Sequence, residues 1–369
     1  MKIRYVRSYV LEAPMPKPWR FNNNTLKNGY ATLVEIETDE GISGVGEALV
    51  RLGPSVPKTI IDEVLAPSII GLDPSNIGAL WERMFSLMRF RGHSGGFFME
   101  AISAIDIALW DIAGKVLNLP VYRLMLGLGR TEIPVYASSI FWDTPKNMAS
   151  EAESLVDQGY RAIKIKIGQG AELDEKCLID IRKAVGSEID LMVDANGAYN
   201  CTDAVRLGRK LEQLDVRWFE EPVPPDDLEG YRNLSHKLDI TIAGGEGVFN
   251  IYGMKKLIES GVRVIQPNVA RAGGITAVRE MAAVAQAFHV PYAPHTGASS
   301  AVCMAATMQL AAAIPNFCIY EHIASENPLV NSILHNPLPV PQNGSITVPQ
   351  QPGIGIELDM KAIAKHHIA

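Results

Sequence analysis

The sequence predicts an α/β protein in which a parallel β/α barrel is joined to a smaller α+β module. Three observations support this fold class. Short apolar runs end in a polar residue at steps of 22 to 27 residues between Asp194 and Glu321. Segments with helical patterning, such as 203–214 and 275–288, lie between these runs. Residues 1 to about 125 lack this repeat and instead pattern as strands followed by helices.

The composition is that of a globular protein large enough for two domains. The chain has 369 residues, of which 47% are hydrophobic and 20% are charged. Its net charge is −7 and it contains no long basic block, so we expect neither nucleic acid nor an anionic membrane as a partner. The four cysteines form no CxxC pair and the first residues lack the apolar core of a signal peptide, which predicts a reduced, cytoplasmic protein.

The N-terminal module is predicted to contain three strands followed by helices. Residues 3–11, 30–38 and 42–47 pattern as strands, and the last two are joined by a turn at 39–41. Helices are predicted over 59–65, 77–88 and 98–116. Between the first two strands, residues 14–28 carry three prolines and three consecutive asparagines, which predicts a long lid or binding loop; an ordinary surface loop is the alternative.

The strand 161–168 is the first run of the repeat, and it carries two lysines. Side chains alternate along a strand, so Lys164 and Lys166 share one face while Ile163, Ile165 and Ile167 share the other. Neighbouring ammonium groups repel, and each is expected to lower the pKa of the other, which is one way to make a lysine a usable base. The pair therefore requires anions opposite it.

The later runs supply those anions. Parallel strands of a barrel end at one mouth, so the polar residues that close them should ring a single pocket. These residues are Lys164, Lys166, Asp194, Glu220, Glu246, Asn268, His295 and Glu321. Three converging carboxylates are hard oxygen ligands, which favours Mg²⁺ or Mn²⁺ over softer metals.

The end of the chain follows the repeat. The run 301–314 is too short and too polar to span a bilayer and predicts a buried helix. Residues 345–348 and 352–356 predict short edge strands and turns. We expect this segment to return and pack on the N-terminal module.

Several motifs together resemble the enolase superfamily, specifically its mandelate racemase subgroup. The motifs are residues 101–115 (AISAIDIALWDIAGK), the Lys-x-Lys strand, Val193-Asp194-Ala195-Asn196, Phe219-Glu220-Glu221-Pro222, Gly245-Glu246 and Ala272-Gly273-Gly274-Ile275. The resemblance spans nearly the whole chain. It implies a modified TIM barrel, (β/α)7β, of residues 126–330 under an α+β capping domain built from residues 1–125 and the C-terminal segment 331–369. It also implies a homo-oligomer.

The resemblance implies a role for each polar residue of the mouth. Asp194, Glu220 and Glu246 would hold Mg²⁺, with Mn²⁺ as the alternative. Lys166 would remove the proton α to a carboxylate, and Lys164 would interact with the substrate carboxylate. Glu321 would donate a hydrogen bond to the enediolate, which requires a protonated side chain. His295 would be a second acid or base on the opposite side.

Asn268 departs from the pattern of the subgroup, in which an aspartate usually stands at this position. We expect its side chain to accept the His295 N–H without supplying charge. His295 should then be a weaker base than in a racemase, although it could still assist the loss of an oxygen from the substrate.

The substrate is predicted less sharply. Trp19, Arg20, Asn22 and Arg51 offer hydrogen-bonding groups that suit a polyhydroxylated acid, and residues 191–199 with 223–225 resemble sugar-acid members of the subgroup, including the galactarolactone cycloisomerase type. We therefore predict a lyase that acts on a sugar acid, as a dehydratase, or on its lactone, as a cycloisomerase. The alternatives are a racemase or epimerase that uses Lys166 and His295, and a non-catalytic sugar-acid-binding protein.

Overall fold

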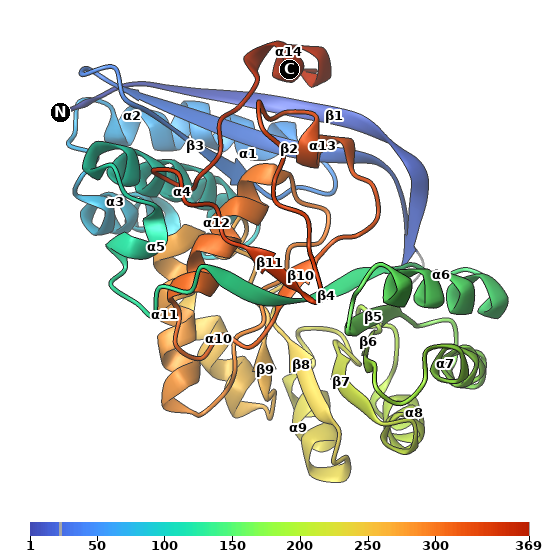
Figure 1. Cartoon of the computed structure of the whole chain (residues 1–369). Coiled ribbons are helices and arrows are strands. Elements are labelled where there is room, and N and C mark those ends of the chain that lie inside the picture. Colours follow the sequence, from blue (N-terminus) through green and yellow to red (C-terminus); the bar gives the residue numbers. More distant parts are fainter. Residues whose placement is uncertain (22–23, 369) are drawn as a thin grey trace.

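The computed structural model describes residues 1–21 and 24–368, which form an antiparallel sheet with helices beside a closed parallel barrel (Figure 1). The sheet contains β1 (Ile3–Phe21), β2 (Asn24–Thr38) and β3 (Ser43–Ala48). The helical elements that follow are α1 (Ser55–Ile60), the π-helical η1 (Ile61–Leu65), α2 (Ala66–Ile69), α3 (Ile77–Arg89), α4 (Phe97–Leu117) and α5 (Val121–Leu124). We call β1–β3 with α1–α4 the cap.

The predicted loop over residues 14–28 is wrong, because β1 and β2 continue through most of this segment as a long hairpin (Figure 1). Ala13, Met15 and Trp19 are buried and Pro14 and Pro16 are exposed, which keeps the alternation of a strand. The pairing breaks between Pro14 and Trp19, where the register shifts. A proline-rich stretch is tolerated here because β1 lies at the edge of this sheet, next to β2.

The second unit is a barrel, as predicted. Its strands are β4 (Glu132–Ile140), β5 (Ala162–Lys166), β6 (Asp190–Asp194), β7 (Val216–Glu220), β8 (Thr241–Gly244), β9 (Val264–Ile265) and β10 (Tyr320–His322). Parallel ladders join neighbours from β10 through β4 to β9, and single bridges from Tyr292 to Ile265 and to Phe317 close the ring. The strand predicted around Tyr292 is this short because Pro291 and Pro294 flank it and lack the N–H that a ladder needs.

Helices alternate with the barrel strands and cover their outer side (Figure 1). They are α6 (Pro145–Asp157), α7 (Ala171–Val185), α8 (Cys201–Gln213), α9 (Leu228–Lys237), α10 (Asn250–Glu259), α11 (Gly274–Ala287) and α12 (Ala301–Ala313). All residues of α12 are buried, as the apolar run 301–314 predicts. None of the described helices combines the length and the apolar character needed to cross a membrane.

The C-terminal segment contains α13 (Pro328–Asn331), β11 (Ser345–Thr347) and α14 (Met360–His366). Contrary to the prediction, β11 does not join the N-terminal module but pairs antiparallel with β4 of the barrel. Later residues do return to that module. The Ile354 amide donates to Asp111 of α4 (2.9 Å), and His367 bridges to Leu11 of β1.

Two buried carboxylates of the cap bind the first turns of barrel helices. Glu47 of β3 accepts the Ser300 amide (2.8 Å), the Ser300 hydroxyl (2.6 Å) and the Cys303 amide (2.8 Å) at the start of α12. Asp106 of α4 accepts the amide (2.9 Å) and the hydroxyl (2.6 Å) of Thr276 in α11. Helix N-termini favour anions, so these contacts join the cap to the barrel despite the cost of burying charge.

Candidate active site

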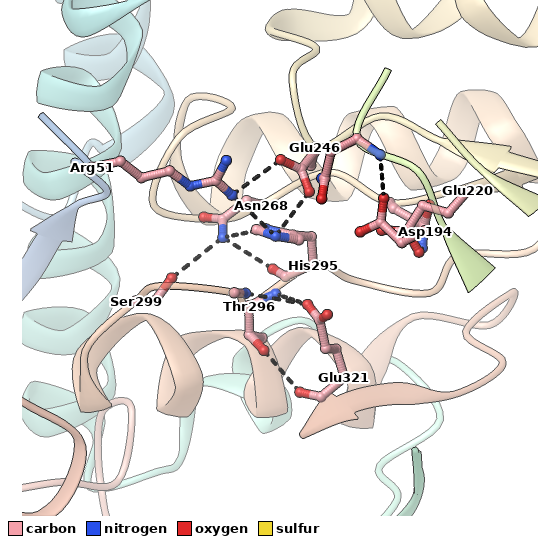
Figure 2. A network of polar contacts seen from close by, with 12 residues as sticks. Arg51, Asp194, Glu220, Glu246, Asn268, His295, Thr296, Ser299 and Glu321 are labelled. Atoms are coloured by element: carbon pink, nitrogen blue, oxygen red, sulfur yellow. Dashed lines mark hydrogen bonds and ion pairs between the residues drawn. The ribbon is translucent and has the colours of Figure 1, made fainter. Parts of the chain in front are cut away.

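The three predicted metal ligands meet at the mouth of the barrel. Asp194 and Glu220 are the last residues of β6 and β7, and Glu246 follows β8 by two residues. All three are buried, and one oxygen of each lies within 4.8 Å of the others (Figure 2). Burial, together with repulsion from Asp194, raises the pKa of Glu220 to about 8. A divalent cation would relieve that repulsion, and three carboxylates are the hard donors that Mg²⁺ or Mn²⁺ binds.

Lys164 and Lys166 share one face, as predicted, but the pKa of Lys164 is not lowered. Lys164 is buried, with its Nζ 2.8 Å from both Glu220 and Glu321. Burial alone would lower its pKa, but Glu220 and Glu321 outweigh that effect and raise it well above the ordinary value. The expected lowering of the Lys164 pKa is therefore wrong, because nearby carboxylates outnumber the one neighbouring ammonium.

Lys166 is the lysine that lines the cavity of the mouth. Its Nζ contacts Asp194 and donates to the Asn196 amide oxygen at 3.0 Å. Asn196 follows β6 with a positive φ of 45°, which turns the chain so that its side chain faces the lysine. Lys164 is absent from the cavity lining, so the geometry offers Lys166 to a bound molecule and holds Lys164 beneath it.

His295 is buried and lines the same cavity as Lys166. Its Nε2 lies 3.0 Å from Glu246 Oε2 and 3.5 Å from Arg51 Nη2 (Figure 2). Together His295 and Arg51 overcome the effect of burial and lower the pKa of Glu246 well below its ordinary value. The strand end therefore places the imidazole beside a predicted metal ligand.

The expected direction of the Asn268–His295 hydrogen bond is wrong. The Asn268 oxygen already accepts the Ala270 amide (2.9 Å), so its Nδ2 faces His295, 3.1 Å from Nδ1 and 3.1 Å from the backbone oxygen. Asn268 therefore donates to Nδ1 instead of accepting from it. His295 then carries its hydrogen on Nε2, the nitrogen that faces Glu246.

Glu321 lies in the cavity lining, but its surroundings are those of a carboxylate and not of the predicted protonated acid. It accepts the backbone amide of Thr296 (Figure 2). It also accepts the backbone amide of Gly297 and pairs with Lys164. Burial alone would raise its pKa, but Lys164 and His295 outweigh that effect and lower it below the ordinary range.

The cap supplies the opposite wall of the cavity. Trp19 lines it, buried and stacked on Phe141 at a centroid distance of 4.8 Å. Arg51 lines it as well and donates to Glu246 at 3.0 Å. Arg20 is exposed and absent from the lining, and Asn22 lies outside the described residues. Of the predicted substrate-binding residues of the cap, the structure thus brings Trp19 and Arg51 to the site and leaves Arg20 out.

Other residues of the lining were missed from the sequence. They are Phe21, Ser138, Phe141, Gly297, Ala298 and Ile323. Ser138 belongs to β4, whose alternating Ile133, Val135 and Ala137 could have indicated a strand, although no acid marks its end. The cavity encloses about 30 Å³, which is smaller than the space a sugar acid needs.

A wider groove, of about 970 Å³, lies between α7 and α8. Neither Lys166 nor His295 lines this groove, whereas both line the small cavity. The small cavity at the strand ends therefore remains the candidate active site.

Two family models match the chain. One, described as "Mandelate racemase / muconate lactonizing enzyme, N-terminal domain", matches residues 6–127, and the other, described as "Enolase C-terminal domain-like", matches residues 147–362. The chain is 33% identical to D-galactarolactone cycloisomerase of Agrobacterium fabrum, over 99% of this chain and 98% of that protein. It is also 33% identical to D-xylonate dehydratase of Haloferax volcanii, over 91% of this chain and 85% of that protein.

Solved structures of other proteins share the fold of this chain. The 3,6-anhydro-D-galactonate cycloisomerase of Zobellia galactanivorans superposes with a TM-score of 0.91 at 34% identity, covering 100% of both chains. A racemase of Streptomyces coelicolor A3(2) with bound magnesium superposes with a TM-score of 0.91 at 28% identity, covering 99% of this chain and 100% of that chain.

Proposed function

We propose that this chain removes the α-proton of a sugar-acid carboxylate or lactone and expels the β-oxygen. The premise is that the chain belongs to the mandelate racemase subgroup of the enolase superfamily. Relatives named as sugar-acid dehydratases and lactone cycloisomerases support this reaction class. One observation carries the proposal: Lys166 and His295 line a single cavity at the strand ends that also hold the three carboxylates.

Asp194, Glu220 and Glu246 would hold Mg²⁺, or Mn²⁺ in its place. When bound, such an ion stabilises the negative charge that develops on a substrate carboxylate as its α-carbon loses a proton. The racemase of Streptomyces coelicolor, solved with magnesium, supports this assignment.

Lys166 would take the α-proton, because its Nζ is the amine that reaches the cavity. To do so it must be neutral when substrate binds and must leave its contacts with Asp194 and Asn196. Lys164 stays beneath as a fixed positive charge, paired with Glu220 and Glu321. It would stabilise the anionic site without exchanging protons.

His295 would assist the departing oxygen through its Nε2–H. A base at this position needs a free Nε2 lone pair and therefore a hydrogen on Nδ1, which would confront the amide N–H of Asn268. That contact disfavours proton abstraction by His295 but allows its Nε2–H to donate a hydrogen bond. Elimination is therefore favoured over racemisation, in which two bases must work on opposite faces.

The test uses Mg²⁺ and a panel of sugar acids and lactones in D₂O, followed by NMR. We expect a 2-keto-3-deoxy acid if the lost oxygen is a hydroxyl, or the ring-opened isomer if it belongs to a lactone. Deuterium at the α-carbon with inversion and without elimination would instead establish a racemase. Binding of a sugar acid without any exchange across the panel would establish a non-catalytic binding protein.

A further inference from the structure

Asp174 is a buried carboxylate outside the cavity, in the first turn of α7. It accepts the backbone amides of Gly168 (2.8 Å) and Gln169 (3.0 Å) and the hydroxyl of Tyr199. Gly168 and Gly170 have φ values of 115° and 116°, which only glycine adopts without strain, and this turn aims the amides at the carboxylate. We call these contacts of Asp174 the Asp174 clamp.

The clamp joins the loop that follows Lys166 at the end of β5 to the loop that follows Asp194 at the end of β6. Gly168 and Gln169 follow β5, which ends at Lys166. Tyr199 belongs to the loop after β6, which also contains Asn196, the acceptor of the Lys166 amine at 3.0 Å. The backbone of the lysine and the partner of its side chain are thus tied to one carboxylate.

An acid in the first turn of a helix is common, because it interacts favourably with the helix N-terminus. An exposed side chain would provide that effect at a lower desolvation cost, whereas burial here raises the pKa of Asp174. Tyr199 adds a contact from a different loop, and its buried ring packs edge-on against Phe219 of β7 at 6.3 Å. Helix capping alone would not require a hydrogen bond from a residue of a second loop.

We propose that Asp174 and Tyr199 are positioning residues for Lys166. They hold its amine in place relative to Asn196 and the substrate. This inference rests on the proposed function, in which Lys166 takes the α-proton. Neither residue lines the cavity, so their effect on the reaction passes through Lys166. A displacement of a reacting group by about 1 Å can reduce a rate by about 100-fold.

The test compares Tyr199→Phe with Tyr122→Phe in the full-length protein with Mg²⁺. Tyr122 of α5 is a matched control, because it is also buried and its hydroxyl donates to Gln350 at 2.8 Å, outside the Asp174 clamp. We expect Tyr199→Phe to lower kcat for α-proton exchange by about tenfold or more, with KM and Mg²⁺ affinity within threefold of wild type. Tyr122→Phe should leave all three within twofold.

A double variant checks the route of the effect. If Tyr199 acts through the clamp, Asp174→Asn combined with Tyr199→Phe should lower kcat no further than the worse single variant. Multiplicative losses would show two independent effects and contradict a shared positioning role.

A second readout keeps this inference separate from the proposed function. If wild type exchanges no α-proton with any sugar acid or lactone, the proposed function fails, but positioning can still be measured. The rate at which trinitrobenzenesulfonate modifies Lys166, followed by peptide mass spectrometry, should change at least threefold in Tyr199→Phe and not in Tyr122→Phe. Equal labelling of Lys166 in both variants, or equal kcat in both, would overturn the proposal.

Discussion

At the scale of single residues, Asn268 decides which nitrogen of His295 carries hydrogen. Its own orientation is fixed by the Ala270 amide on one side and the backbone oxygen of His295 on the other. Its Nδ2 therefore donates to Nδ1, and the N–H of the ring points from Nε2 into the site. A carboxylate at the same position would reverse this arrangement, because it could only accept.

The first prediction concerns Asn268→Asp. The carboxylate should draw the hydrogen to Nδ1 and free the Nε2 lone pair, so that His295 can accept a proton from the second face. We expect the substrate of opposite α-configuration to exchange deuterium at least tenfold faster than with wild type, as measured by NMR. Asn316→Asp, whose amide binds backbone oxygens of α11 and Val290, is the control. No gain in exchange would refute the tautomer assignment.

The second prediction concerns His322, whose pKa is lowered to about 4 by burial. Its Nδ1 is hydrogen-bonded to the Tyr160 hydroxyl at 2.8 Å. Between pH 6.5 and 4 the unfolded chain binds a proton that the folded chain does not, so stability falls as pH falls through this window. The full loss is about 3 kcal/mol.

Urea unfolding at several pH values measures this loss. His322→Gln should flatten the fall in unfolding free energy between pH 6.5 and 4.5. Replacing the exposed His335 with glutamine is the control and should leave the slope unchanged. An equal slope in His322→Gln and wild type would show that this histidine does not contribute to the acid sensitivity.

At the scale of elements, cap and barrel meet through carboxylates that accept hydrogen bonds from helix N-termini. Glu47 holds the start of α12, which directly follows the loop that carries His295. Asp106 performs the same task for α11. The position of the cap is therefore tied to helices that follow the site residues Asn268 and His295.

The third prediction concerns Glu47→Ala. The variant leaves the amides of Ser300 and Cys303 without their acceptor in a buried place, which costs about 2–4 kcal/mol of unfolding free energy. Urea unfolding measures this loss, and the exposed Glu40→Ala is the control. A loss below about 1 kcal/mol in Glu47→Ala would mean that water replaces the carboxylate and that this junction is weak.

The sequence predicts an element well where a polar residue closes its strand, and poorly where none does. Asp194, Glu220 and Glu246 could be placed because parallel strands bring their carboxyl ends to one mouth and each strand ends in an acid. Only the part of the β1–β2 hairpin over residues 14–28 is predicted as a loop, because its prolines obscure the alternation of a strand. Phe21 and Phe141 carry no polar signal, so their place in the cavity depends on how the cap lies on the barrel.

At the scale of the whole molecule, the site needs both units. The barrel contributes the acids, Lys166 and His295, whereas the cap contributes Trp19, Phe21 and Arg51. The sequence could indicate which chemistry the mouth supports, because that chemistry lies on consecutive strands. It could not indicate that Arg20 points outward, since the pairing of β1 with β2 shifts register between Pro14 and Trp19.

The most direct test of the central claim follows the substrate α-proton by NMR in D₂O, with and without Mg²⁺, for wild type and Lys166→Met. We predict loss of the α-proton with wild type only when Mg²⁺ is present, and a rate at least 100-fold lower with Lys166→Met although Mg²⁺ still binds. Unchanged exchange in Lys166→Met, or exchange by wild type that persists after complete removal of divalent cations, would contradict the account.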